Sequence, residues 1–503
     1  MPPIEGADAM RGSIRYLSRG RVIERSDVAP TEMLIDHLRL VRGLTGTREG
    51  CGEGDCGACT VALGRLDGDR LVYEPVTACI RPTASIDGCE LVTIEDLDAD
   101  GTLHPIQEAM VRHHGAQCGF CTPGIVMSLF TLWAREGEVD REAVIDRLAG
   151  NLCRCTGYRP IVDAALEACD ARRDARPPIT FLVRAAEAAA RLAEMADGVD
   201  VFLGDETRFF AAPRRLDTLL ELTRAFPDAT LLGGATDVGL WITKGGRDLP
   251  RVIHLGHVEG LDTIVEDEEA ITLGAGVSLE RAGRALGRLD PDVAAIFRRI
   301  GGAQVRASGT LGGNIANGSP IGDTPPLLIA LGATLELCSA DRVRTLDLED
   351  FFLDYGRQDR SPGEIVTAIR VPRPTAAQAF RAWKIAKRHD QDISTLLGAV
   401  RLTLAGPTVV EARIAFGGMA GTPRRASGAE AALIGASLVE AASWRAALEA
   451  LRLDFTPLTD LRGTSDYRLE VAVSLLGKAL AEIAGTPTSK TRVFARREGG
   501  GHD

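Results

Sequence analysis

Apolar and polar residues alternate near the start of the chain, and the spacing then becomes helical. Residues 13–24 alternate on both sides of Arg19-Gly20, which predicts a β-hairpin. A helical period follows behind Thr31, the predicted N-cap, and its apolar members are Leu34, Ile35, Leu38 and Val41. Further short strands are predicted at Thr60–Leu63, Arg70–Tyr73 and Glu90–Ile94. Hairpin, helix and strands together predict one small α+β domain over residues 11–97.

Helical spacing dominates from His104 to Cys169 and predicts an all-α domain over residues 98–170. The expected helices are Pro105–His113, Pro123–Arg135, Arg141–Leu148 and Pro160–Cys169. Pro123 and Pro160 suit a first helical turn, where the missing N–H group is not needed. The four-helix domain then carries its cysteines between helices.

Residues 171–208 have the composition of a linker, with an Ala/Glu-rich run whose order the sequence leaves open. Strands alternate with helices over residues 209–374; the strands are Thr230–Leu232, Val252–His254, Ala270–Gly274 and Thr334–Leu337. Residues 375–490 combine strands at Ala399–Leu404 and Glu411–Phe416 with helices. Residues 491–503 form a tail, in which Arg496–Asp503 is expected to be disordered. The chain of 503 residues is therefore expected to be a multidomain α+β protein.

Composition limits the classes of partner. A net charge of −12 and 5% aromatic residues argue against nucleic-acid binding. No stretch is apolar enough to span a bilayer and no secretory leader is recognisable, so we expect a cytoplasmic protein without a membrane partner. In that reducing compartment the eleven cysteines point to metal or redox ligands rather than disulfides. Cys89, Cys169 and Cys338 stand apart and are expected to be small buried residues.

A dense cysteine loop lies within Gly50–Cys59. Cys51, Cys56 and Cys59 follow the spacing C-x4-C-x2-C, and Cys79 comes nineteen residues later. This is the spacing of a plant-type [2Fe–2S] cluster with four thiolate ligands. The interleaved glycines allow tight turns that point backbone N–H groups at sulfur. A zinc site or disulfides are the alternatives, although zinc favours two separated C-x2-C pairs.

A second cysteine set is formed by Cys118, Cys121, Cys153 and Cys155. The two close pairs lie at predicted helix ends, and the helix after Pro123 offers N–H groups to an anionic cluster. Taken alone, this spacing leaves zinc or a pair of disulfides open. Next to the plant-type loop these alternatives are less favoured, because the two sets together complete eight ligands.

Two glycine-rich stretches suggest phosphate binding. Residues Leu231-Leu232-Gly233-Gly234-Ala235-Thr236-Asp237-Val238 follow a strand and could bind phosphates through backbone N–H groups, with a simple tight turn as the alternative. Residues 306–323 are dense in small, hydroxyl and amide side chains and end at Asp323, which could accept hydrogen bonds from ribose or ribitol hydroxyls.

Together these blocks resemble the molybdenum hydroxylases, the family of xanthine dehydrogenases, aldehyde oxidases and carbon monoxide dehydrogenases. The resemblance covers nearly all of residues 13–490. It implies a β-grasp [2Fe–2S] ferredoxin domain, a helical [2Fe–2S] domain, an FAD-binding domain of the vanillyl-alcohol-oxidase (PCMH) type over 209–374, and a C-terminal domain of the CO dehydrogenase flavoprotein type over 375–490. Each cysteine set then holds one [2Fe–2S] cluster. Gln117 falls where the family's glutamine approaches molybdopterin, with a helix-capping amide as the alternative.

The resemblance also implies FAD contacts. Residues 231–238 would hold the pyrophosphate, and further contacts would come from Thr310, Gly313, Asn314, Asp323 and Val366. Lys384 falls near the isoalloxazine ring, where a cation would stabilise an anionic reduced flavin; a solvated strand lysine is the alternative. Ile300 replaces a family aromatic residue, and Gln391 replaces an acidic one.

The family's molybdopterin domain does not follow residue 490, so we expect a small subunit of the bacterial xanthine dehydrogenase type. By resemblance, a molybdopterin-containing large subunit oxidises xanthine or hypoxanthine, and electrons pass through the second and then the first cysteine set to FAD and NAD+. An assembly of two small and two large subunits is implied. Aldehyde oxidase, another N-heterocycle dehydrogenase and a stand-alone iron–sulfur flavoprotein reductase are the alternatives.

Overall fold

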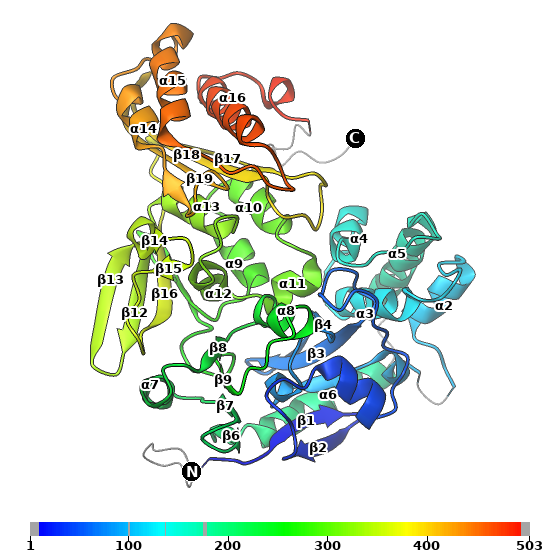
Figure 1. Ribbon diagram of the computed structural model, residues 1–503. Helices are drawn as coiled ribbons and strands as arrows, with labels where there is room; N and C mark the ends of the chain where they lie inside the picture. Colours follow the sequence, from blue (N-terminus) through cyan, green and yellow to red (C-terminus); the bar gives the residue numbers. More distant parts are fainter. Residues whose placement is uncertain (1–9, 99–100, 136, 175–178, 494–503) are drawn as a thin grey trace. The chain divides into compact units, whose positions relative to one another are not determined.

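The computed structural model describes residues 10–98, 101–135, 137–174 and 179–493. Of the predicted tail, only residues 491–493 are among them. The chain divides into two compact units (Figure 1). The first unit runs to Gly260 and also includes Gly301–Gly309, and the second unit comprises Leu261–Ile300 and the chain from Thr310 onward.

A five-stranded sheet opens the first unit, in the order β2-β1-β5-β3-β4. Its strands are β1 (Ile14–Ser18), β2 (Arg21–Arg25), β3 (Thr60–Asp67), β4 (Arg70–Thr77) and β5 (Glu90–Val92). The β1–β2 hairpin turns at Arg19-Gly20, both at positive φ, as predicted. The sheet and the helical segment between β2 and β3 form the predicted β-grasp domain.

That helical segment differs from the prediction at its start. It comprises α1 (Leu34–Asp36) and a π-helical turn, η2 (His37–Val41). Met33, not Thr31, is the N-cap, and it makes no side-chain capping bond. The first N–H groups are satisfied from the loop after β4, because Leu34 donates to the Arg81 carbonyl and Ile35 to the Ala78 carbonyl. A side-chain cap is therefore not required.

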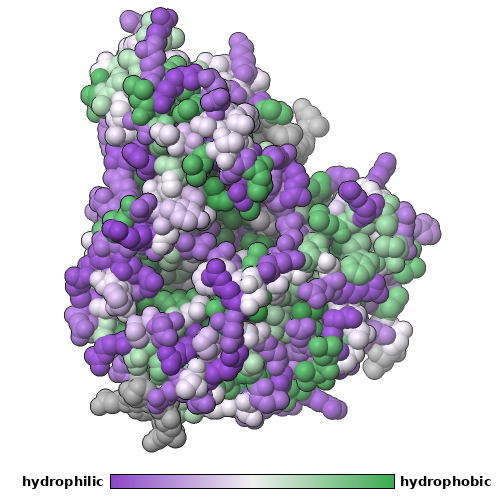
Figure 2. Space-filling model, viewed as in Figure 1, coloured by the Kyte–Doolittle hydropathy of each residue, from purple (hydrophilic) through white to green (hydrophobic). Residues whose placement is uncertain are grey.

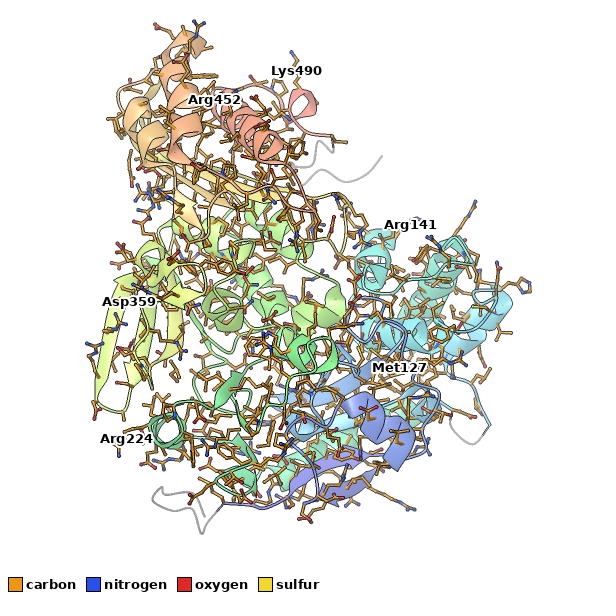
Figure 3. The ribbon with its side chains drawn as sticks, in the orientation of Figure 1. Met127, Arg141, Arg224, Asp359, Arg452 and Lys490 are labelled. Carbon is orange, nitrogen blue, oxygen red and sulfur yellow. The ribbon has the colours of Figure 1, made fainter. Side chains whose placement is uncertain are left out.

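The helical domain contains α2 (Pro105–Arg112), α3 (Thr122–Trp133), α4 (Arg141–Leu148) and α5 (Arg159–Asp174), so all four predicted helices are confirmed. Pro123 and Pro160 are the second residues of their helices. Helix α3 is buried along nearly its whole length and packs on β3. Met127 lies on α3 inside this domain, whereas Arg141 marks the start of α4 (Figure 3).

The predicted linker contains regular structure. Helix α6 (Ile179–Met195) packs on β1, β3 and β4, and Ala188, Leu192 and Met195 bury their side chains with Leu17. A second sheet follows, in the order β6-β7-β9-β8, formed by β6 (Val201–Gly204), β7 (Phe209–Ala212), β8 (Thr230–Leu232) and β9 (Arg251–His254). Helices α7 (Leu216–Ala225) and α8 (Val238–Thr243) connect its strands. This sheet shares one core with the β-grasp sheet.

The second unit begins with a five-stranded sheet, in the order β10-β11-β16-β12-β13. Its strands are β10 (Ile264–Glu266), β11 (Ala270–Gly274), β12 (Thr334–Ser339), β13 (Arg342–Asp347) and β16 (Ile365–Pro372). The helices of this region are α9 (Leu279–Leu286), α10 (Pro291–Arg298), α12 (Leu311–Ala316) and α13 (Thr324–Leu331). They and the sheet enclose one apolar core.

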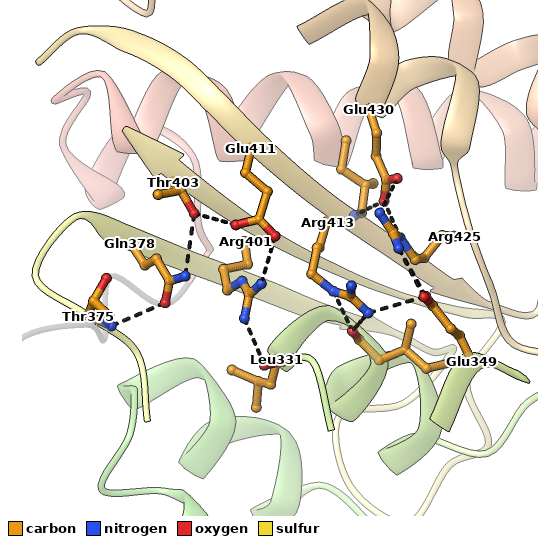
Figure 4. A network of polar contacts seen from close by, with 12 residues as sticks. Leu331, Glu349, Thr375, Gln378, Arg401, Thr403, Glu411, Arg413, Arg425 and Glu430 are labelled. Carbon is orange, nitrogen blue, oxygen red and sulfur yellow. Dashed lines mark hydrogen bonds and ion pairs between the residues drawn. The ribbon is translucent and has the colours of Figure 1, made fainter. Parts of the chain in front are cut away.

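A four-stranded sheet completes the second unit, formed by β17 (Gln378–Ile385), β18 (Leu396–Ala405), β19 (Thr408–Gly417) and β20 (Arg424–Arg425). Helices α14 (Ser427–Leu433), α15 (Arg445–Asp454) and α16 (Ser465–Ile483) share a second core with it. Arginines of this sheet, Arg413 and Arg425, converge on Glu349, and Arg425 also pairs with Glu430 (Figure 4).

The exposed surface is that of an ordinary globular protein. On the face drawn in Figure 2, hydrophilic side chains predominate and hydrophobic ones occur in small groups. No helix of the described residues is both long and apolar enough to cross a membrane.

Candidate functional site

The first cysteine set lies in the first unit. Cys51 and Cys56 are half-buried in the loop before β3, Cys59 is buried at the end of that loop, and Cys79 is buried after β4. The Sγ atoms of Cys59 and Cys79 are 3.2 Å apart, and Cys51 interacts with both Cys56 and Cys79. The four thiols predicted as ligands are therefore brought together.

The loop around Cys51 suits an anionic sulfur ligand. Its Sγ atom accepts backbone N–H groups from Asp55 and Cys56 at 3.4 Å and from Glu53 at 3.5 Å. Hydrogen bonds from the Cys56 and Cys79 thiols and from this backbone lower the pKa of Cys51. Inward N–H groups around a cysteine sulfur stabilise the thiolate that a cluster requires. The residues present fit a [2Fe–2S] cluster.

The second cysteine set also converges, within the helical domain. Cys118 interacts with Cys155, and Cys121 interacts with Cys153. Burial opposes ionisation of Cys153, but the Thr156 hydroxyl 3.1 Å away and nearby N–H groups lower its pKa. Cys118 and Cys155 are exposed, which leaves one side of the set at the surface of this unit.

The alternatives to iron–sulfur ligation can be compared with this geometry. All eleven cysteines are free, so the disulfide alternative is wrong. Cys89, Cys169 and Cys338 are buried, as predicted. Among the described residues, no three His, Cys, Asp or Glu side chains are grouped as ligands of a single metal ion. Gln117 is exposed and is not the N-cap of α3, which is Cys121.

The two cysteine loops touch each other. The Leu152 N–H group, beside Cys153, donates to the Cys56 carbonyl at 2.9 Å. Arg48 donates to the Gly119 carbonyl at 3.3 Å and lies over the ring of Phe120, 5.6 Å from its centroid. These contacts place the two predicted cluster sites next to each other in one unit.

The glycine turn, residues 231–238, follows β8 in the first unit. A Cβ atom at Gly234 would lie 1.7 Å from the Ser308 carbonyl oxygen, so only glycine fits there. Ala235 takes a left-handed backbone with φ of 64°. Among the described residues, no acceptor binds the backbone N–H groups of residues 233–236. These free donors fit the phosphates of a dinucleotide cofactor.

Helix α8 connects this turn to the first cysteine set. A Cβ atom at Gly239 would lie 2.2 Å from the Ile80 carbonyl oxygen, next to Cys79. At the other end of α8, the Lys244 ammonium donates to the Cys51 carbonyl at 2.5 Å. The predicted phosphate turn is thus tied to the predicted cluster loop.

In the second unit, Thr310 and Asn314 have local structural partners. Thr310 caps α12 by accepting the Gly313 N–H group at 3.0 Å. Asn314 accepts the Thr324 hydroxyl at 2.6 Å, next to Asp323. Val366 is buried in the core of this unit.

Lys384 is buried on β17, so the alternative of a solvated strand lysine is wrong. Its ammonium lies 2.5 Å from Asp323 Oδ2, and the Ser394 hydroxyl donates to Asp323 Oδ1 at 2.5 Å. Both predicted cofactor residues are therefore members of one buried ionic group, with Ser394 as a third member that the sequence did not reveal. Gln391 has a φ of 48°, and its buried amide atoms have no partner among the described residues.

Comparisons with known proteins agree with this arrangement. Family models match residues 93–166 as a [2Fe-2S] binding domain, 205–374 as the FAD binding domain in molybdopterin dehydrogenase, and 381–483 as a CO dehydrogenase flavoprotein C-terminal domain. The modules therefore define an iron–sulfur and flavin-binding protein of multidomain α+β fold. The chain belongs to the molybdenum hydroxylase family, as its motifs predicted.

Curated relatives come from more than one branch of that family. Xanthine dehydrogenase of Emericella nidulans is 30% identical over 92% of this chain and 38% of its own length. Aldehyde oxidase 3 of Mus musculus is also 30% identical, over 81% of this chain and 34% of its own. The chain thus spans little more than a third of the length of these relatives.

A solved structure of carbon monoxide dehydrogenase from Hydrogenophaga pseudoflava is also similar. It has 29% sequence identity and a TM-score of 0.52, and the match covers 55% of this chain and 97% of that chain. This similarity supports the fold of the part of the chain that it covers.

Proposed function

We propose that this chain is the electron-relay small subunit of a xanthine dehydrogenase. The observation that carries the proposal is the meeting of two four-cysteine sets in one unit, joined by the bond from Leu152 to Cys56 and tied through α8 to the glycine turn. When bound, [2Fe–2S] clusters supply one-electron carriers and FAD supplies conversion between single electrons and hydride.

The chain's own residues have distinct tasks in this proposal. Cys51, Cys56, Cys59 and Cys79 would hold one cluster, and Cys118, Cys121, Cys153 and Cys155 the other. The N–H groups that donate to the Cys51 sulfur would stabilise it as a thiolate. The open N–H groups of residues 233–236 would bind the FAD pyrophosphate, and Thr310, Gly313, Asn314 and Val366 would make further contacts.

The buried group around Asp323 suggests a positioning role for Lys384. Because Asp323 neutralises the ammonium at 2.5 Å, Lys384 is not an isolated cation. We infer that it orients the Asp323 carboxylate, whose oxygens accept from Lys384 and Ser394 and would face FAD hydroxyls with a fixed geometry.

The proposed partner is a molybdopterin-containing large subunit that oxidises xanthine or hypoxanthine, with NAD+ as the acceptor and two copies of each subunit. The exposed side of the second cysteine set supports such docking, because Phe120 and Leu152 beside it are each 45% exposed. Apolar side chains around a redox centre favour contact with a partner. Xanthine dehydrogenase relatives support the choice of substrate.

Purification of the natural complex tests the proposal. We expect four iron atoms and one FAD per chain, two [2Fe–2S] EPR signals after reduction, and a co-purifying molybdenum subunit. The complex should form NADH from hypoxanthine and NAD+. A single EPR signal contradicts the relay, and absence of NADH contradicts the xanthine assignment.

Aldehyde oxidase is the second candidate, because a mouse aldehyde oxidase matches this chain with the same 30% identity as the fungal xanthine dehydrogenase. Oxidation of an aromatic aldehyde in place of hypoxanthine by the same complex would favour it. Isolation without any molybdenum protein would favour a stand-alone reductase.

A further inference from the structure

A short helix of the flavin-binding region belongs to the iron–sulfur unit. Helix α11 (Ala303–Ser308) lies in the segment Gly301–Gly309, which clusters with the first unit although the residues on both sides of it in sequence belong to the second. It packs on β4 and α4. Gln304 is 1% exposed and Arg306 is 2% exposed, so both polar side chains point into the unit.

The Gln304 amide binds three different parts of the iron–sulfur domains. Its Nε2 amino group lies 2.8 Å from Asn151 Oδ1, 3.0 Å from Ser128 Oγ and 3.1 Å from Thr60 Oγ1, so its two hydrogens are shared among three acceptors. Thr60 directly follows Cys59, and Asn151 lies two residues before Cys153. One amide therefore bridges the loops of both cysteine sets.

The acceptors of Gln304 are linked to one another. The Ser128 hydroxyl donates to Asn151 Oδ1 at 2.6 Å, and Asn151 Nδ2 donates to the Gly57 carbonyl at 3.1 Å. Gly57 directly follows Cys56. A fully buried network whose donors and acceptors are satisfied specifies one arrangement of its members.

The Gln304 amide is tightly packed against the second cysteine loop. A Cβ atom at Gly150 would lie 1.9 Å from Gln304 Oε1, so a side chain there would displace the amide. A Cβ atom at Gly57 would lie 2.1 Å from the Gly150 carbonyl oxygen, and this backbone contact requires glycine.

The other end of α11 contacts the glycine turn. The Ser308 carbonyl is the atom that excludes a side chain at Gly234. Between the two ends, Arg306 pairs with Asp146 of α4 at 2.9 Å. One helix therefore contacts the two cysteine loops and the proposed phosphate turn.

We propose that Gln304 is a positioning residue that fixes the spacing of the two cysteine loops. The inference rests on the proposed function for its purpose, since the distance between two clusters is one of the factors that set the rate of electron transfer between them. Its physical basis is independent of the clusters, because the contacts exist within the polypeptide.

Hydrogen exchange of the iron-free full chain tests directly whether Gln304 holds the two cysteine loops together; this set of contacts is called the Gln304 clasp below. Gln304→Leu removes every hydrogen bond that the amide donates to the two loops, so the Leu152 amide should exchange about tenfold faster or more. Gln378→Leu is the control: it removes a partly buried amide of β17 in the second unit that donates to Thr403 at 3.4 Å, and it should leave Leu152 exchange unchanged.

EPR of the reduced, iron-loaded chain gives the second readout. The magnetic interaction between the two clusters depends steeply on their separation. Gln304→Leu should therefore change the splitting of the EPR signals or broaden them, with iron content retained. Gln304→Glu keeps the size of the side chain but loses the Nε2 donors. It should change the EPR signals in the same direction as Gln304→Leu. If neither variant folds, Ser128→Ala, which removes one acceptor, provides the test.

The outcomes separate the two proposals. Unchanged Leu152 exchange in a folded Gln304 variant overturns the clasp, whatever the chain binds. If the wild-type chain takes up no iron but the Gln304 variants still speed Leu152 exchange, the relay function fails and the clasp stands. Faster exchange with an unchanged cluster interaction would show that Gln304 stabilises the loops without setting the spacing of the clusters, and this too overturns the positioning role.

Discussion

His37 is a buried residue whose neutral form the fold requires. It is fully buried, its Nδ1 atom lies 2.8 Å from Arg25 Nη1, and its Nε2 atom lies 2.7 Å from Tyr16 Oη. Burial, followed by the charges of Arg25 and Arg42, lowers its pKa to about 4. Because Arg25 only donates, Nδ1 must remain unprotonated.

The pH dependence of stability follows from this shift. In the unfolded chain His37 takes up a proton near its ordinary pKa, whereas the folded chain resists it, so stability is fully present above that value and is lost as pH falls toward about 4. The loss from His37 between pH 7 and pH 5 should be on the order of 1–2 kcal/mol. His37→Gln should be less stable at pH 7 but show a shallower fall in urea titrations. Val111→Gln, at an exposed site on α2, should keep the wild-type slope; an equally steep fall in His37→Gln would contradict this account.

Lys384 is predicted to be essential for the stability of the second unit. Replacement by methionine leaves the Asp323 carboxylate buried without its ion-pair partner, at a cost of about 3 kcal/mol or more. Chemical denaturation should show this loss, and Lys384→Met with Asp323→Asn should recover part of it. The control Lys387→Met removes an exposed ammonium that binds the Leu461 carbonyl and should cost less than about 1 kcal/mol. Equal losses at both positions would argue against a special role for the buried pair.

Residue-level features divide into those that sequence spacing determines and those that the fold determines. The cysteine sets were predictable because ligand spacing is a local property of a loop. Lys384 and Asp323 were named singly, but their pairing depends on how α13 and β17 pack. Gln304 gave no local signal, since its three acceptors lie more than 150 residues away in sequence. A buried amide next to conspicuous glycines is visible only in three dimensions.

At the scale of elements, the glycine turn of residues 231–238 is a tightly constrained connection. Gly234→Ala would force a methyl group to 1.7 Å from the Ser308 carbonyl oxygen, so the turn or α11 must move. We expect a loss of about 2–3 kcal/mol in stability from this overpacking, and loss of FAD from the purified protein. Thermal unfolding and flavin absorbance measure both. Gly12→Ala, with open space around its Cβ position, should change neither; a Gly234→Ala variant that retains FAD would exclude the turn as the phosphate site.

Periodicity predicted the bounds of several helices and strands well. Arg141–Leu148, Thr230–Leu232 and Ala270–Gly274 match their predicted bounds. The predicted start of the first helix was wrong because carbonyl groups of a distant loop replace a side-chain cap. The order of α6 stayed open in the sequence because its apolar face is buried by β1 and its neighbours, not by adjacent helices. Tertiary partners of this kind leave no mark on local spacing.

At the scale of the whole molecule, the two units have separate cores. Their boundaries do not coincide with those of the domains in sequence, because Gly301–Gly309 belongs to the first unit. The predicted flavin-binding residues fall in both units: residues 231–238 in the first, and Thr310, Asp323 and Lys384 in the second. All eight proposed iron ligands fall in the first unit. The two kinds of cofactor should therefore affect the stability of the two units differently.

Removal of iron is predicted to destabilise only the first unit. Ligand binding contributes to the stability of the unit that forms the site, because the unfolded chain has no preformed ligands. Calorimetry of the iron-loaded chain should show two unfolding transitions. Treatment with chelator and reductant should lower the midpoint temperature of one of them. Cys56→Ser should lower the same transition, whereas Cys338→Ser, at a buried cysteine of the second unit, should affect only the other. If chelation moved both transitions together, the units would not unfold separately; if it moved neither, the cysteine sets would hold no structural metal. A shift confined to the transition that Cys56→Ser lowers would link the iron to that cysteine set and to the unit that Gln304 holds together.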